Sequence, residues 1–378
     1  MTTQALEPTL PRYAEACLDA VATSVLAAAG VPGEPNPLRL APAERTCVLL
    51  VDGLGWELLR AHPAAAPFLS ELAMPATPLT SGFPATTATS LGTLGTGRPP
   101  GRHGLLGYQV AIPGTGSLLN ALRWDESVDP CQWQPGSTIF ERAAAAGVRA
   151  TRVSARQLQG SGLSAAALRG AAFAAADTPG MLVSAAADAL AGEGPALVMV
   201  YYGDLDATGH LAGCGSDAWR YQLAHVDKLA EQLAAALPHG SVLHVTADHG
   251  MTDVPAADRI DADQLPALRE GVELLGGEPR ARHVYCRPGA AGDVLAAWTE
   301  VLGERAWVVT RDQAVAEGWF GPVDGAFLPR IGDVVAAPSG SCAVVATRAE
   351  PRESALIGMH GSLTPADQLV PLLTYEVT

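Results

Sequence analysis

The sequence lacks the features of a membrane-spanning or nucleic-acid-binding protein. No stretch approaches the roughly 18 charge-free apolar residues that span a bilayer. The 24 basic residues against 39 acidic ones leave a formal charge of −15, which argues against a nucleic-acid-binding surface. Residues 1–11 have no basic start, and residues 14–29 carry Glu15 and Asp19, which predicts an amphipathic helix and not a secretion signal. We therefore expect neither a membrane nor a nucleic-acid polymer as partner.

Cysteine pairs and common hydrolase motifs are also missing. The six cysteines are scattered and form no CxxC pair, which predicts buried free thiols in a reducing cytoplasm. We therefore expect a cytoplasmic protein. A serine hydrolase using Ser90 is one alternative, but no Gly-x-Ser-x-Gly elbow is present.

Apolar residues make up 48% of the 378 residues, which predicts a globular protein with a sizeable core. Three apolar runs have the character of strands buried on both faces: residues 46–51, 196–202 and 241–247. Helices are expected between and around them, at residues 13–29, 56–61, 67–72, 137–146, 165–176, 181–191, 217–237 and 366–373. This alternation predicts an α/β fold with a mostly parallel sheet.

The chain also divides by composition. We predict an N-terminal helix and linker at residues 1–42, and a core formed by residues 43–251 and 353–378. Residues 252–352 carry short strand-like pieces separated by Gly and Pro turns, with a helix near residues 292–302. We interpret them as a smaller α+β cap inserted beside the sheet.

Each predicted core strand ends in a carboxylate. Asp52 follows the first strand, Asp206 and His210 lie in the loop expected after the second, and Asp248 and His249 follow the third. A single aspartate after a strand is usually a cap or turn residue. Three in one chain would converge at the carboxyl edge of a parallel sheet, where α/β proteins bind ligands.

Residues 83–97 are unusually rich in hydroxyl side chains for a helix. A helix beginning near Thr86 and Thr87 would aim a hydroxyl and free backbone N–H groups at one point, which suits an anion and an activated oxygen.

Further along, His360 joins the carboxylates and histidines as a possible ligand. Two zinc ions favour this mixture of oxygen and imidazole donors, although other divalent metals could bind. Carboxylates around two ions about 4 Å apart suit in-line phosphoryl displacement.

These residues resemble the alkaline phosphatase superfamily, and within it the nucleotide pyrophosphatase/phosphodiesterase group. The resemblance runs from about Cys47 to the C-terminus through "LLVDGLG", "FPATTATS", "DLDATGH", "ADHGM" and "MHG". It implies a central, mostly parallel sheet sandwiched by helices. It also implies one zinc at Asp206, His210 and His360, and a second at Asp52, Asp248 and His249 with the Thr87 hydroxyl.

The resemblance further implies a reaction. The spacing from Phe83-Pro84 and to Thr96-Gly97 places the nucleophile at Thr87. Its hydroxyl would attack phosphorus in line and form a covalent phospho-threonine, which water then cleaves with net retention at phosphorus. The implied substrates are small molecules with phosphodiester or pyrophosphate bonds.

One position departs from the family pattern. Nucleotide-cleaving relatives carry an asparagine about 21 residues past the nucleophile, and the match here is Tyr108. A phenol can donate a similar hydrogen bond to a phosphoryl oxygen, so we predict that Tyr108 binds substrate or is simply a loop aromatic. Arg98, Arg102 and His103 are expected in a solvated loop.

Several other activities remain possible for these residues. A phosphomonoesterase would need an added cation that the sequence does not reveal, and a phosphonate hydrolase would use the same threonine and two zincs. A phosphoglycerate-mutase-like isomerase normally uses serine with manganese. A sulfatase is disfavoured because no Cys-x-Pro-x-Arg segment occurs. A non-catalytic metal-binding protein would not need a hydroxyl beside the ligands.

Overall fold

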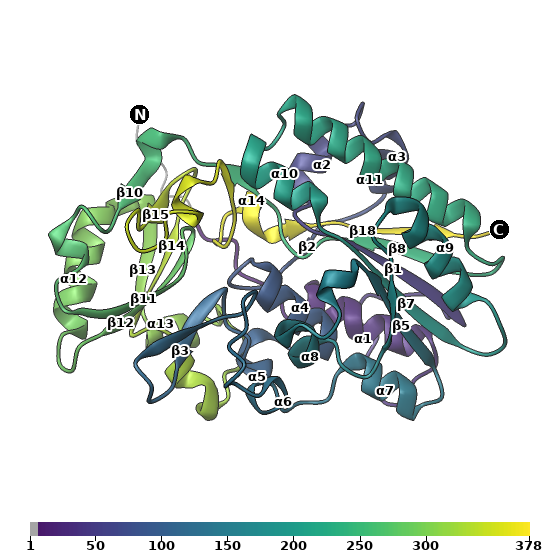
Figure 1. The fold of residues 1–378 in the computed structure, drawn as a ribbon, viewed down its shortest axis with the longest axis horizontal. Coiled ribbons are helices and arrows are strands. Elements are labelled where there is room, and N and C mark those ends of the chain that lie inside the picture. The colour runs from purple at the N-terminus through teal and green to yellow at the C-terminus, as the bar shows by residue number, and fades with distance from the viewer. Residues whose placement is uncertain (1–6) are drawn as a thin grey trace.

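The computed structural model describes residues 7–378, and a six-stranded sheet lies at its centre (Figure 1). The strand order is β18-β8-β1-β7-β5-β6, in which only β18 runs antiparallel to its neighbour. The strands are β1 (Arg45–Val51), β5 (Arg149–Ser154), β6 (Ala172–Ala175), β7 (Ala196–Tyr202), β8 (Val242–Thr246) and β18 (Leu372–Glu376). Residues 46–51 of β1 are fully buried, as a strand between two helical layers requires. The predicted α/β fold is confirmed.

Helices cover both faces of this sheet (Figure 1). One layer contains α1 (Leu18–Ala28), α4 (Thr87–Thr96), α5 (Pro100–His103), α6 (Pro130–Trp133), α7 (Ile139–Ala145) and α8 (Gly162–Ala167). The other contains α2 (Trp56–Ala61), α3 (Pro67–Ala73), α9 (Pro179–Leu190), α10 (Asp204–Ala212) and α11 (Asp217–Ala236). Ser216 caps α11 by accepting from the Trp219 N–H, and Leu223, Val226 and Leu233 form its buried stripe.

A second sheet, with order β11-β12-β14-β13, lies beside the first (Figure 1). Its elements are β11 (Val272–Glu278), β12 (Ala281–Cys286), β13 (Ala306–Thr310), β14 (Val334–Pro338), α12 (Ala291–Leu302) and α13 (Arg311–Ala316). Trp298 of α12 is fully buried in a separate apolar cluster with residues of this sheet. The buried Arg280–Asp367 ion pair, 2.6 Å between Nη2 and Oδ2, ties the segment to the C-terminal part of the core. That residues 252–352 form a unit of their own stays a prediction.

Short strand pairs complete the described structure. They are β3 (Gln109–Ile112) with β4 (Ser117–Asn120), β2 (Leu79–Thr80) with β17 (Leu369–Val370), β9 (Thr252–Asp253) with β16 (Gly358–Met359), and β10 (Arg259–Asp261) with β15 (Ala343–Val345). Among residues 7–378, no helix combines the length and apolar character needed to cross a bilayer.

Three of the predicted elements were wrong. Residues 165–176 are not one helix: α8 ends at Ala167, Gly170 takes a positive φ of 95°, and β6 pairs with β5. Residues 366–373 form α14 (Pro365–Gln368) and then strand, because β17 pairs with β2 and β18 with β8. In both places pairing with a distant strand outweighs local helix propensity. A loop is expected at residues 203–210, but residues 204–210 form most of α10.

Helix α4 is rich in hydroxyl and glycine residues, and its residues from Ala88 to Thr96 are all buried. The Thr93 and Thr96 hydroxyls donate to the carbonyls of Thr89 and Gly92, four residues earlier, at 3.0 and 2.7 Å. Gly95 lets the helix approach α8 so closely that a Cβ there would lie 1.9 Å from the Ala167 carbonyl oxygen. The helix is thereby held tightly against its neighbours.

His103 is buried, not solvated as expected, and so are His244 and His283, which like His103 lie outside the two predicted ligand groups. Burial lowers the pKa of His103 to about 3 and those of His244 and His283 to about 4. The neutral His283 ring makes two hydrogen bonds. Its Nδ1 accepts from the Gly332 N–H at 3.1 Å, and its Nε2 lies 2.9 Å from the Leu106 carbonyl oxygen. The native state therefore binds protons at these sites far less readily than the unfolded chain.

We predict that acid weakens the fold. Because the native pKa values lie below the unfolded value of about 6.5, stability is complete above pH 6.5 and falls as the pH drops toward 4. Protonation linked to each of His103, His244 and His283 should lower the free energy of unfolding by about 2 kcal/mol between pH 7 and pH 5. Urea unfolding at the two pH values measures this loss.

A variant apportions the loss among the histidines. His244→Leu should reduce this loss by about a third, because it removes one of the three rings; within residues 7–378 the His244 ring makes a single hydrogen bond, to the Thr374 hydroxyl at 3.0 Å. A pH dependence that is flat in the wild type, or unchanged in the variant, would contradict this account.

Candidate active site

The predicted ligands meet at one edge of the central sheet. The strands β8, β1 and β7 are neighbours and run parallel, so their carboxyl ends lie together. Two groups form there, each with one ligand atom per residue and these atoms within 4.8 Å of one another: Asp52, Asp248 and His249; and Asp206, His210 and His360. Asp206 and His210 share one face of α10 because they are four residues apart. The structure brings together the same two sets that the sequence predicted, and their role as ligands stays a prediction.

The tautomers of the three histidines are fixed by backbone carbonyls. The Nδ1 atoms of His210, His249 and His360 lie 2.7, 2.9 and 2.9 Å from the carbonyl oxygens of Gly358, Gly250 and Ala85. A carbonyl oxygen only accepts, so each Nδ1 carries the proton. In the neutral ring, each Nε2 then keeps the lone pair that a metal needs.

The carboxylates of the site are crowded and partly unsatisfied. Asp248 is fully buried, and burial together with the Asp52 charge raises its pKa well above the usual range. Burial also opposes ionisation of Asp52, but the nearby His249 ring, whose Nε2 lies 3.2 Å from Asp52 Oδ1, and the Tyr201 hydroxyl outweigh burial and lower the pKa of Asp52. Asp206 Oδ1 and Asp248 Oδ2 are buried without a hydrogen-bond partner in the described chain. Buried oxygens left in this state fit divalent cations, and the N/O donor set suits zinc.

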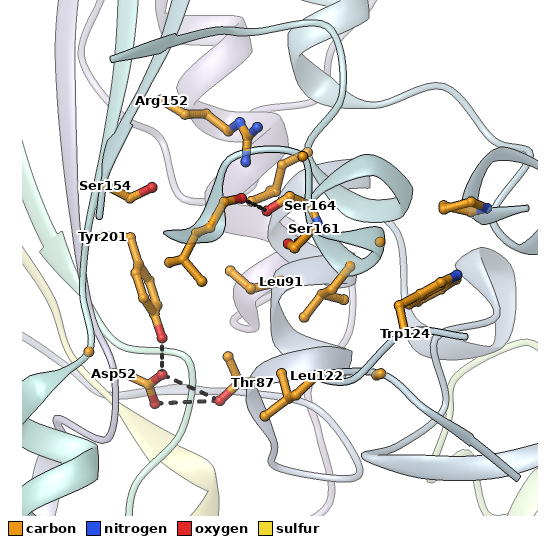
Figure 2. Close-up of a pocket in the computed structure, with 18 of the residues that line it drawn as sticks. Asp52, Thr87, Leu91, Leu122, Trp124, Arg152, Ser154, Ser161, Ser164 and Tyr201 are labelled. Carbon is orange, nitrogen blue, oxygen red and sulfur yellow. Dashed lines mark hydrogen bonds between the residues drawn. The ribbon is translucent and has the colours of Figure 1, made fainter. Parts of the chain in front are cut away.

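Thr87 begins α4 and faces the first ligand group. Its Oγ1 lies 3.4 and 3.5 Å from the two Asp52 carboxylate oxygens (Figure 2). The same oxygen lies 3.3 Å from His249 Nε2. Thr86 takes the extended conformation before the helix, and its hydroxyl donates to Glu278 Oε2 at 3.3 Å. Of the two adjacent threonines, only Thr87 therefore points its hydroxyl at the ligands.

Ser90 is not available as a nucleophile. It is fully buried, and its hydroxyl donates to the Asp248 carbonyl oxygen at 2.7 Å. This bond connects α4 to the segment that carries Asp248 and His249. Ser90 thus helps to hold Thr87 in position, which removes the serine-hydrolase alternative.

Two side chains near the ligands were missed by sequence reasoning. The Tyr201 hydroxyl donates to Asp52 Oδ2, and burial together with the Asp52 charge raises the pKa of this phenol well above its usual value (Figure 2). Two adjacent phenols, Tyr201 and Tyr202, at the end of an otherwise apolar strand were the available signal. Glu278 ends β11, and its Oε2 lies 3.5 Å from His360 Nδ1. Burial raises the pKa of Glu278 to about 8, and nothing in its local sequence indicated this position.

Two pockets open at the site. The larger, about 710 Å³, is lined by Asp52, Thr87, Asp206, Tyr201 and many apolar residues (Figure 2). The smaller, about 190 Å³, is lined by Thr86, Thr87, Tyr108, Asp206, His210, Glu278, Arg352, Glu353 and His360, among others. Tyr108 donates to Glu353 Oε1 at 3.0 Å, and burial raises the pKa of Tyr108 to about 12. Its predicted contact with substrate stays a prediction.

A hydroxyl at a helix N-terminus, flanked by two ligand groups of oxygen and imidazole donors, defines the site of a metal-dependent hydrolase. The sequence pattern described as type I phosphodiesterase / nucleotide pyrophosphatase matches residues 46–363. The chain belongs to this metal-dependent family of the alkaline phosphatase superfamily. The predicted family is confirmed. A comparison with curated proteins finds no match.

Solved structures share the fold. Murine ectonucleotide pyrophosphatase/phosphodiesterase 5 in complex with AMP superposes with a TM-score of 0.70 at 18% identity, covering 87% of each chain. The human protein gives 0.67 at 19%, covering 88% of this chain and 87% of that one. Phosphonoacetate hydrolase from Sinorhizobium meliloti in complex with phosphonoformate gives 0.67 at 19%, covering 87% and 89%. At these identities the similarity concerns the fold alone.

Proposed function

We propose that the chain hydrolyses phosphodiester or pyrophosphate bonds of small molecules through a covalent phospho-threonine at Thr87. The observation that carries this proposal is the position of Thr87 Oγ1, 3.3–3.5 Å from Asp52 and His249, in a pocket that Asp206, His210 and His360 also line. One ligand group thus flanks the hydroxyl, and the other lies across the same pocket.

Two divalent cations, zinc being the expected pair, would be held by these groups. They would supply Lewis acidity toward the Thr87 hydroxyl, the phosphoryl oxygens and the leaving oxygen. The tautomers of His210, His249 and His360, and the unsatisfied oxygens of Asp206 and Asp248, support this assignment.

The chain's own residues have separate tasks in this reaction. The Thr87 hydroxyl would release its proton to solvent as its oxygen bonds to phosphorus and the bond from phosphorus to the leaving oxygen breaks. Water would then bond to phosphorus, displace the Thr87 oxygen and supply the proton that this oxygen takes up. The free N–H groups of the first turn of α4 favour the anionic phosphoryl group. Tyr201 would orient Asp52 through its hydrogen bond, and Tyr108, which lines the smaller pocket together with Thr87, would contact a phosphoryl oxygen.

Phosphonate hydrolysis and phosphomonoester hydrolysis are the alternatives within this site. The monoesterase would need a cation for the extra charge, and Arg352 lines the smaller pocket beside Thr87 and Tyr108. Arg352 is exposed, so water screens its charge and it favours a monoester only weakly.

A comparison of substrates on one enzyme preparation tests the proposed function. We expect kcat/KM to be highest for bis-p-nitrophenyl phosphate or a nucleoside triphosphate cleaved at its pyrophosphate bond, and lower for p-nitrophenyl phosphate and phosphonoacetate. A preparation that favours the monoester or phosphonoacetate would overturn the diester assignment while leaving the Thr87 chemistry standing.

A further inference from the structure

The larger pocket extends from the reacting hydroxyl between mostly apolar walls (Figure 2). Asp52 and Thr87 lie at one end with Leu122 beside them, Leu91 lies further along toward Arg152, and Trp124 lines one side. Leu163, Leu168 and Met199 add further apolar surface. The volume of about 710 Å³ is ample for a small organic group attached to the phosphorus.

A cation lies at the opposite end of this pocket. Arg152 comes from β5, and Figure 2 shows its guanidinium directed into the pocket, well away from Asp52 and Thr87. Ser154, two residues on, lines the same end of the pocket. Side chains two apart on a strand lie on one face, so both are presented together.

Arg152 has no anionic partner within the described chain. Its guanidinium carbon lies 5.4 Å from the centre of the Phe173 ring, and among residues 7–378 its buried Nε has no hydrogen-bond partner. Two other partly buried arginines are paired with acids, Arg142 with Glu34 at 2.5 Å and Arg169 with Glu141 at 3.1 Å, and the buried Arg330 donates to the carbonyl oxygens of Gly104 and Trp133. A partly buried cation without a partner is costly, as the lowering of the pKa of Arg152 by burial reflects. A ligand anion would remove this cost.

We propose that the Arg152 end of the larger pocket binds a second negative charge on the substrate. The substrate is then a phosphodiester with one arm that is apolar along its length and ends in an anion, a carboxylate or a phosphate. Arg152 would bind the anion through paired N–H donors, while Leu91, Leu122 and Trp124 enclose the arm. This inference rests on the proposed function, because it takes Thr87 as the position of the scissile phosphorus.

Three synthetic diesters test the subsite. Each carries one p-nitrophenyl group and one six-carbon arm, which ends in a methyl group, a carboxylate or a phosphonate. The wild type should show a kcat/KM about 10- to 100-fold higher for a charged arm than for the methyl arm, as expected for charge-assisted hydrogen bonds. The carboxylate and phosphonate arms show which anion the site prefers.

Variants assign this preference to Arg152. Arg152→Met should abolish the ratio of charged to uncharged arm, and Arg152→Lys should keep part of it. Arg149→Met is the matched control on the same strand, because Arg149 is exposed and contacts the carbonyls of Ala189 and Ala191. No preference in the wild type, or a preference that survives in Arg152→Met, would overturn the inference.

A binding measurement separates this inference from the proposed function. Calorimetry on Thr87→Ala protein compares hexyl phosphate with the same phosphate ester ending in a carboxylate. If the wild type cleaves none of the diesters but the carboxylate ligand binds more tightly through Arg152, the proposed function fails and the subsite stands. If the diesters are cleaved and neither charged arm is favoured in rate or binding, the subsite fails and the proposed function stands.

Discussion

Thr87→Ala is expected to lower kcat for bis-p-nitrophenyl phosphate at least about a thousand-fold, because the variant lacks the oxygen that bonds to phosphorus. The metal content should stay at two ions per chain, since Asp52, Asp248 and His249 remain in place. Elemental analysis and initial rates on the same preparation measure the two quantities together.

Two further substitutions on α4 act as controls for this result. Thr87→Ser retains a hydroxyl and should recover part of the activity. Thr89→Val, on the same helix, removes a buried hydroxyl that has no hydrogen-bond partner in the part of the chain the structure describes, and should change the rate little. A Thr87→Ala protein that hydrolyses the diester at the wild-type rate would remove Thr87 from the reaction.

Removal of the metal ions is expected to have an effect of similar size. The site gathers Asp52, Asp206 and Asp248 around imidazole Nε2 atoms, and the residues alone provide no Lewis acid for the leaving oxygen. Chelation should therefore reduce hydrolysis to the uncatalysed background. Zinc added back should restore the rate and raise the thermal unfolding midpoint, because binding to the native state stabilises it.

A ligand variant makes the metal assignment specific. His360→Ala should lose one of the two ions, because His360 belongs to the group with Asp206 and His210 and not to the group beside Thr87. A His360→Ala protein that kept both ions and the full rate would refute this ligand. Activity that survives complete chelation would refute the metal assignment as a whole.

Much of the core and the ligand sets could be predicted from the sequence. Residues 46–51, 196–202 and 241–247 are apolar on both faces because helices cover both sides of the sheet, and this pattern is visible in any single strand. Once the strands are parallel neighbours, the residues that follow them must meet at one edge. Position therefore pointed to Asp52 and Asp248, and the spacing to His210 together with the family motif pointed to Asp206.

Other features depend on contacts between distant segments. The helix predicted at 366–373 is mainly strand because Leu372 to Glu376 pair with β8, more than a hundred residues earlier. Glu278 approaches His360 only because the second sheet docks beside the first. Arg152 lies in an ordinary strand sequence, and its lack of a partner becomes evident only when the surrounding side chains are placed.

The stereochemical course at phosphorus tests the central claim most directly. A p-nitrophenyl phosphorothioate diester of one configuration is hydrolysed in ¹⁸O-labelled water, and the configuration of the product is determined. Attack by Thr87 followed by attack of water inverts phosphorus twice, so we predict net retention. Net inversion would show a single displacement by water and would contradict the phospho-threonine.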